Sequence, residues 1–206
     1  MKAIEVHREG TSAGALEGRV ICGDVRGADG KVTVEKGQVL DAELARRLFD
    51  LPWRVLHLLE LEPGDIHEEP AGARLSQASA GEGVEVRGYS GGQWTLAAAR
   101  RGLLRVREQA LGEINAQEGM AVYTLYDLQP VEAGEAVARA KIVPLAIAEG
   151  LVKRAEARAW ATGGLVTVKA FRPLRIGALT RANLPAPQRG RFEAALTEKV
   201  NWFGSS

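Results

Sequence analysis

The chain has 206 residues, 46% of them hydrophobic, which is enough to bury a core in one large or two small domains. With 27 basic and 26 acidic side chains, its net charge of +1 creates no overall attraction to nucleic acid or to an anionic membrane. The single cysteine, Cys22, excludes an internal disulfide framework and fits a reducing compartment. The N-terminus lacks the apolar core of a signal peptide, and no window approaches the roughly 18 apolar residues of a membrane span. We therefore expect a cytoplasmic protein without a nucleic-acid or membrane partner.

The first sixty residues predict short strands, one helix and one interior strand. The β-type runs at 15–25 and 31–34 are broken by glycines, as in small antiparallel strands joined by tight turns. Asp41 has the side chain of an N-cap, and the spacing of apolar residues after it predicts a helix over 42–49. Apolar residues occupy both faces of the alternating run 53–60, so we expect this strand inside a sheet.

The densely polar stretch 62–70 holds the first candidate site residues, Asp65, His67 and Glu68. Asp65 followed by Glu68 resembles a capping box and predicts a helix continuing over 71–80. The same side chains at a helix N-terminus would suit an anionic ligand, because free N–H groups and the helix dipole meet there. Both interpretations stay open at this point. A metal hydrolase at this stretch is disfavoured, since no second histidine or His/Cys pair completes a ligand set.

Strands are predicted at 84–87, 93–99 and 103–106, followed by a helix over 107–115. The glycines around 81–92 indicate turns rather than a phosphate-binding loop, because a lysine-bearing Walker pattern is absent.

A predicted β-hairpin forms the centre of the chain. The apolar runs 122–128 and 137–143 flank turn residues, which is typical of two paired strands. In the second run, Arg139 and Lys141 alternate with apolar residues, so both should point to the same face, toward water or a ligand. The hairpin contains no nucleophile or metal-ligand set, and we assign no catalytic residue.

The C-terminal part predicts a helix over 148–161, strands at 165–168 and 174–179, and a last helix over 188–202. The last helix carries an apolar stripe that needs a covering surface. A buried strand followed by such a helix normally returns to a second strand of the same sheet, and no strand follows here. We interpret the segment after residue 174 as the first strand and helix of an unfinished α/β domain. The stripe consists of Phe192, Leu196, Val200 and Phe203.

Four ordered blocks of sequence carry a family resemblance. They are GDIHEEPAGARL, GLLRVREQALGEIN, VEAGEAVARAKIVPLAI and FRPLRIGALT. In this order they resemble the N-terminal half of bacterial molybdopterin-binding proteins related to molybdopterin molybdenumtransferase. The resemblance covers the chain from roughly residue 30 to its end.

The resemblance implies an α+β chain that handles the molybdenum cofactor. Residues 1–170 would form a β-rich region with short helices, which could divide into 1–80 and 81–170. Residues 171–206 would be the first strand and helix of an incomplete three-layer α/β domain that binds molybdopterin. The family's later glycine-rich and acidic loops have no counterpart here.

The candidate cofactor-binding residues are Asp65, His67, Glu68, Arg139, Lys141 and Thr180. Thr180 comes from the family motif, in which threonine and glycine precede an acidic residue. This chain has Arg181 and Ala182 instead, and arginine would obstruct a close approach of the backbone if the turn needs a positive φ.

An alternative function is a non-catalytic scaffold. The exposed last helix would then mediate formation of a homo-oligomer or docking onto molybdoenzyme assembly factors, and this role would not need the pterin-binding loops.

Overall fold

The computed structural model describes residues 1–181 and 183–206. Within these ranges the chain is a mixed α+β structure of six helices and five small sheets, in which all named strand pairs are antiparallel. None of the described helices is both long and apolar enough to span a bilayer. The buried side chains form two separate clusters, one within residues 16–58 and one within residues 71–168.

The N-terminal region is built around an interior strand, as predicted. Its elements are β1 (Lys2–His7), α1 (Ala13–Leu16), β2 (Val20–Ile21), β3 (Val25–Arg26), β4 (Val32–Val34), α2 (Ala42–Leu48) and β5 (Val55–Glu60). Strand β5 lies between β1 and β2, while β3 and β4 form a separate hairpin. Asp41 caps α2, its Oδ1 accepting a hydrogen bond from the N–H of Leu44 at 2.7 Å. The predicted cap and helix are therefore confirmed.

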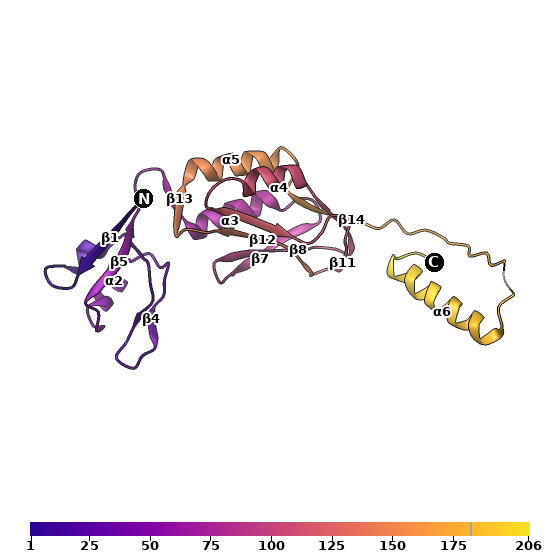
Figure 1. Cartoon of the computed structure of the whole chain (residues 1–206), viewed down its shortest axis with the longest axis horizontal. Coiled ribbons are helices and arrows are strands. Elements are labelled where there is room, and N and C mark those ends of the chain that lie inside the picture. The colour runs from indigo at the N-terminus through magenta and orange to yellow at the C-terminus, as the bar shows by residue number, and fades with distance from the viewer. Residues whose placement is uncertain (182) are drawn as a thin grey trace.

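The larger middle region contains the predicted hairpin. Its elements are β6 (Asp65–His67), α3 (Glu68–Ser79), β7 (Val84–Ser90), β8 (Gln93–Ala98), β9 (Gly102–Val106), α4 (Glu108–Asn115), β10 (Met120–Thr124), β11 (Pro130–Val131), β12 (Ala136–Ile142), β13 (Ala146–Ala148), α5 (Glu149–Trp160) and β14 (Val166–Ala170). Strands β10 and β12 pair antiparallel, with Met120 opposite Ile142. The main sheet runs β10-β12-β8-β7, and α3, α4 and α5 lie on one side of it (Figure 1).

The alternation predicted for the second strand of the hairpin is confirmed. Ala138, Ala140 and Ile142 are buried on the side covered by α3, whereas Arg139 is exposed and Lys141 half-buried on the opposite, open side. One face of β12 thus belongs to the core, and the other is accessible to a ligand.

The C-terminal arm, which we define as residues 171–206, extends away from both regions (Figure 1). It ends in α6 (Ala186–Trp202), which confirms the predicted last helix, yet none of the side chains of α6 is buried. The strand predicted at 174–179 is wrong. This segment pairs with no strand of the described chain, and its backbone bonds instead link Leu174 and Ile176 to Ser206, at 2.9 and 2.7 Å.

The base of the arm is anchored to the middle region. The indole Nε1 of Trp202 donates to Glu132 at 2.7 Å, and the guanidinium of Arg101 lies 5.4 Å from the indole ring centroid. Phe171 and Phe203 pack against the same ring, with centroid distances of 5.6 and 4.9 Å. This aromatic cluster fixes where the arm leaves the body. Farther along α6, Phe192 is exposed, while Leu196 and Val200 are half-buried.

Candidate functional site

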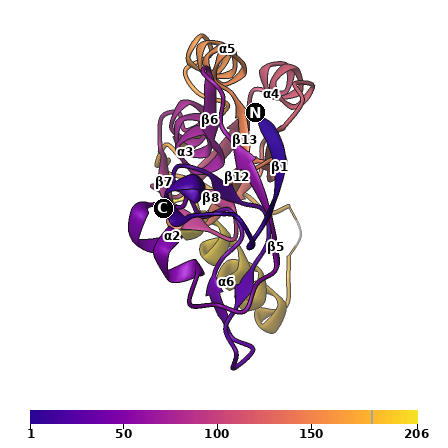
Figure 2. The same cartoon turned by 90° about the vertical axis from the view of Figure 1, so that its left-hand side faces the viewer.

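Three segments far apart in the sequence form a cleft of about 670 Å³ at the junction of the N-terminal and middle regions. They are the loop before α2, the start of α3, and the turn that joins β7 to β8. Figure 2 views the molecule from the side of the N-terminal region. The cleft is lined by Glu35, Lys36, Gly37, Gln38, Val39, Asp41, Leu44, His67, Glu68, Glu69, Tyr89, Gly91 and Gly92. We call it the acidic cleft.

His67 links the start of α3 to the loop before α2. The N–H of Glu69 donates to its Nδ1 at 3.3 Å, so Nδ1 carries the lone pair and Nε2 carries the proton. Nε2 lies 2.7 Å from the carbonyl oxygen of Gly37 and donates to it. Since both ring nitrogens are engaged, His67 acts as the N-cap of α3 and as a clamp onto the loop before α2. No group of three or more His, Cys, Asp or Glu within residues 1–181 and 183–206 is arranged to hold a metal ion.

The charges of the cleft are predominantly negative. Its lining contains the carboxylates of Glu35, Asp41, Glu68 and Glu69, with Lys36 as the opposing cation. Within the described part of the chain, none of these four carboxylates has a cationic nitrogen within 4.0 Å. Burial raises the pKa of Glu68, and burial followed by the charges of Glu68 and Glu69 raises the pKa of the Tyr89 hydroxyl. The cleft is thus suited to a cationic group rather than to a phosphate.

We expect Glu68→Gln to be more stable than the parent protein at neutral pH. Because burial raises the pKa of Glu68 above its unfolded-state value, the folded protein holds this proton more tightly than the unfolded chain does. The cost of the buried charge is therefore present above the raised pKa, and it disappears below about pH 4, where both states are protonated. Urea unfolding across this pH range measures the difference, with the exposed Glu17→Gln as control. A Glu68→Gln variant that gains nothing at neutral pH would contradict this assignment.

A cationic patch lies on the open face of the sheet, next to the cleft. We define it as Tyr123, Arg139 and Lys141. Arg139 lies opposite Tyr123 in the strand register, and the Tyr123 side chain is 45% exposed. The methylene chain of Lys141 reaches the turn at Gly92, where an added Cβ would lie 3.9 Å from its Cε. Arg139 contacts Gln93 at 3.3 Å, and neither cation has a carboxylate within 4.0 Å among the residues that the structure describes.

The structure brings four of the six predicted site residues into one area: His67 and Glu68 in the cleft, and Arg139 and Lys141 on the adjoining face. Asp65 lies apart, and the capping role predicted for it is wrong because it belongs to strand β6. Its carboxylate accepts from the N–H of Glu62 at 2.9 Å and pairs with the N-terminal ammonium. The bond to that ammonium is the main cause of the lowered pKa of Asp65.

Thr180 is also remote from the cleft and the cationic patch. It is exposed on the arm and lines a separate cavity of about 490 Å³ beside Arg189 and Phe192 of α6. Ala182, the third residue of the family motif, lies outside the described residues.

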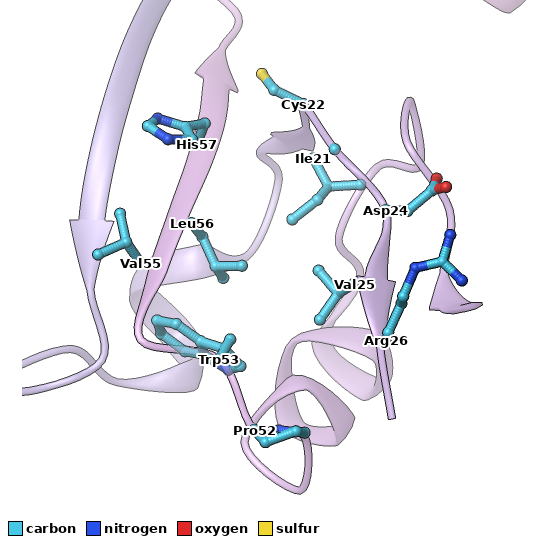
Figure 3. A pocket seen from close by; sticks show the side chains of 11 residues that line it. Ile21, Cys22, Asp24, Val25, Arg26, Pro52, Trp53, Val55, Leu56 and His57 are labelled. Carbon is cyan, nitrogen blue, oxygen red and sulfur yellow. The ribbon is translucent and has the colours of Figure 1, made fainter. Parts of the chain in front are cut away.

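A further cavity, of about 290 Å³, lies within the N-terminal region (Figure 3). Figure 3 shows Cys22 and His57 at one end of it and Pro52 and Trp53 at the other. Burial raises the pKa of the Cys22 thiol, so little thiolate forms at neutral pH. We assign no chemistry to this cavity.

Comparison of the chain with protein-family models, curated proteins and solved structures finds no match.

Proposed function

We propose that this chain takes part in molybdenum-cofactor handling by binding molybdopterin on the cationic patch. The observation that carries the proposal is the placement of Arg139 and Lys141 two residues apart on the open face of the sheet, without carboxylate partners among the described residues. The family resemblance of the four sequence blocks supplies the identity of the ligand. The proposed role is binding rather than turnover, and it needs no catalytic residue.

The chemistry of the patch matches the parts of a pterin phosphate. A guanidinium presents a planar fork of donors to phosphate oxygens, and an ammonium adds a compact positive charge. The exposed ring of Tyr123 offers a flat surface on which a pterin ring can pack. The acidic cleft repels the phosphate, while the carboxylate of Glu68 can accept hydrogen bonds from the N–H groups of the pterin. Asp65 is paired with the N-terminal ammonium and Thr180 lines a separate cavity on the arm, so we leave both out of the proposed site.

We also propose, on the same resemblance, that the arm corresponds to the start of a three-layer α/β domain, although the segment 174–179 forms no strand in the described structure. The segment 174–179 has no regular secondary structure, and its Leu174, Ile176 and Leu179 are 57%, 48% and 101% exposed. These exposures suit a strand whose neighbouring strands are supplied from elsewhere.

Replacing Arg139 and Lys141 together by alanine is expected to weaken molybdopterin binding by about tenfold or more, since two charge-assisted contacts to phosphate are lost. Ultrafiltration of mixtures with molybdopterin released from a molybdoenzyme measures the bound fraction, which is read as pterin fluorescence after acid oxidation. Arg87→Ala is the matched control, because Arg87 lies on β7 of the same sheet and is already paired with Glu85 at 2.6 Å. Equal binding by the double variant and the control would overturn the proposed site.

An assembly role is the second candidate function, and the uncovered helix α6 favours it. Phe192 on this helix is 42% exposed, and no side chain of α6 is buried against the body. Apolar groups kept in water by an anchored helix gain free energy when a second surface covers them. Self-association of the purified chain tests this role, and sedimentation velocity over a range of concentrations measures it.

A further inference from the structure

The C-terminal arm carries a net positive charge, whereas the rest of the chain carries a net negative one. Residues 171–206 contain six basic and two acidic side chains, whereas residues 1–170 contain 21 basic and 24 acidic ones. Two arms would therefore repel each other, which disfavours a contact between the arms of two copies. An acidic surface is the complementary partner for the arm.

Helix α6 carries arginines and an exposed aromatic side chain that could contact an acidic surface. Arg189 and Arg191 both precede the exposed Phe192, by three residues and by one, while Glu193 follows it; within the described residues neither arginine has a carboxylate within 4.0 Å. Aromatic and arginine side chains are both enriched in the cores of protein interfaces relative to the rest of the surface.

The acidic cleft is the complementary surface. Its four carboxylates lack cationic partners within the described ranges, and they surround apolar groups of Val39, Leu44 and Tyr89. Val39 and Tyr89 remain 45% and 39% exposed. The ring of Phe192 would cover these apolar groups, and Arg189 and Arg191 would pair with the carboxylates of the cleft.

We propose that the arm docks into the acidic cleft of a second copy of this chain. In Figure 1 the arm leaves the middle region beyond β14, on the side away from the N-terminal region, whereas the cleft is lined by residues of the N-terminal region, the start of α3 and the β7–β8 turn; we therefore place the contact between copies. The aromatic cluster around Trp202 holds the base of the arm in place, which limits the entropy lost on docking. This inference rests on the assembly role and identifies the surface that the arm contacts.

A mixing experiment with two charge-reversed variants tests the proposal. Variant one carries Arg189→Glu and Arg191→Glu on the arm, and variant two carries Glu35→Lys and Glu69→Lys in the cleft. Sedimentation velocity without any pterin is expected to show association of the parent, strongest at about 50 mM salt and weakened about tenfold or more at about 500 mM. Each variant alone should be monomeric. Their equimolar mixture should form a complex, because the intact arm of variant two meets the intact cleft of variant one.

A control variant and two further outcomes separate docking into the acidic cleft from the assembly role in general. Glu17→Lys with Glu118→Lys changes the net charge as much as variant two does but lies outside the cleft, and should associate like the parent. Loss of association in variant one but not in variant two would overturn docking into the cleft and leave the assembly role standing. A parent that stays monomeric at all concentrations would overturn both. Formation of the mixed complex also shows that the two variants are folded.

Discussion

Replacing Arg74 by methionine is expected to lower the free energy of unfolding by about 3 kcal/mol. Arg74 on α3 holds two carboxylates of α5, with its Nε 2.7 Å from Glu156 and its Nη1 2.8 Å from Glu149. The Glu156 side chain is only 8% exposed, so removing its partner leaves a buried charge without compensation. The hydrogen bond to Glu156 is also the first cause of the raised pKa of Arg74.

Chemical denaturation of the Arg74→Met variant, a Glu156→Met variant and their combination separates the ion pair from packing. Because a well-packed apolar pair can replace a buried ion pair at little cost, we expect the combination to recover most of the lost stability. A loss below about 1 kcal/mol in Arg74→Met would show that the pair is as weak as an ordinary surface salt bridge.

Gly81→Ala is expected to destabilise the protein by about 3 kcal/mol, because the backbone of residue 81 lies against two other segments. A Cβ at this position would lie 2.5 Å from Thr167 Cγ2 and against the carbonyl oxygen of Gly163. Its N–H also donates to Val166 at 2.9 Å, so the backbone cannot move away without losing this bond. The added methyl group must therefore displace β14 from the end of α3.

The matched control for this prediction is Gly112→Ala. Gly112 lies in α4, and a Cβ there would meet no atom within 4 Å. Alanine at an open helical position should raise stability by about 0.5–1 kcal/mol. Thermal or urea unfolding of both variants gives the comparison. If Gly81→Ala behaves like Gly112→Ala, the close contacts of residue 81 with Gly163 and with Thr167 of β14 are incorrect.

Sequence patterns correctly predicted those features that are determined by residues close in sequence. The period of two in 137–143 correctly separated the buried alanines from Arg139 and Lys141, because alternation alone decides which face of a strand is inward. The Asp41 cap marked the start of α2, since one side chain satisfies a free N–H of the first turn. Strand β1 was not predicted, because its apolar Ile4 and Val6 alternate with charged residues near the N-terminus.

The failures of prediction have long-range causes. The run 174–179 has the composition of a buried strand, but a strand requires a neighbour, and the described structure offers this segment none. Asp65 matches a capping box, yet pairing of β6 with β13 shifts the helix start to Glu68. The acidic cleft could not be predicted, because its walls come from three segments whose meeting no local pattern encodes.

The pterin content of the purified protein tests the cofactor proposal most directly. The parent and the Arg139→Ala/Lys141→Ala variant would be isolated from a host that makes molybdenum cofactor, and pterin would be measured per mole of protein as fluorescence after acid oxidation. We predict pterin in the parent and loss of most of it in the variant. A parent that carries no pterin and shows no thermal shift with added molybdopterin would contradict the proposed function.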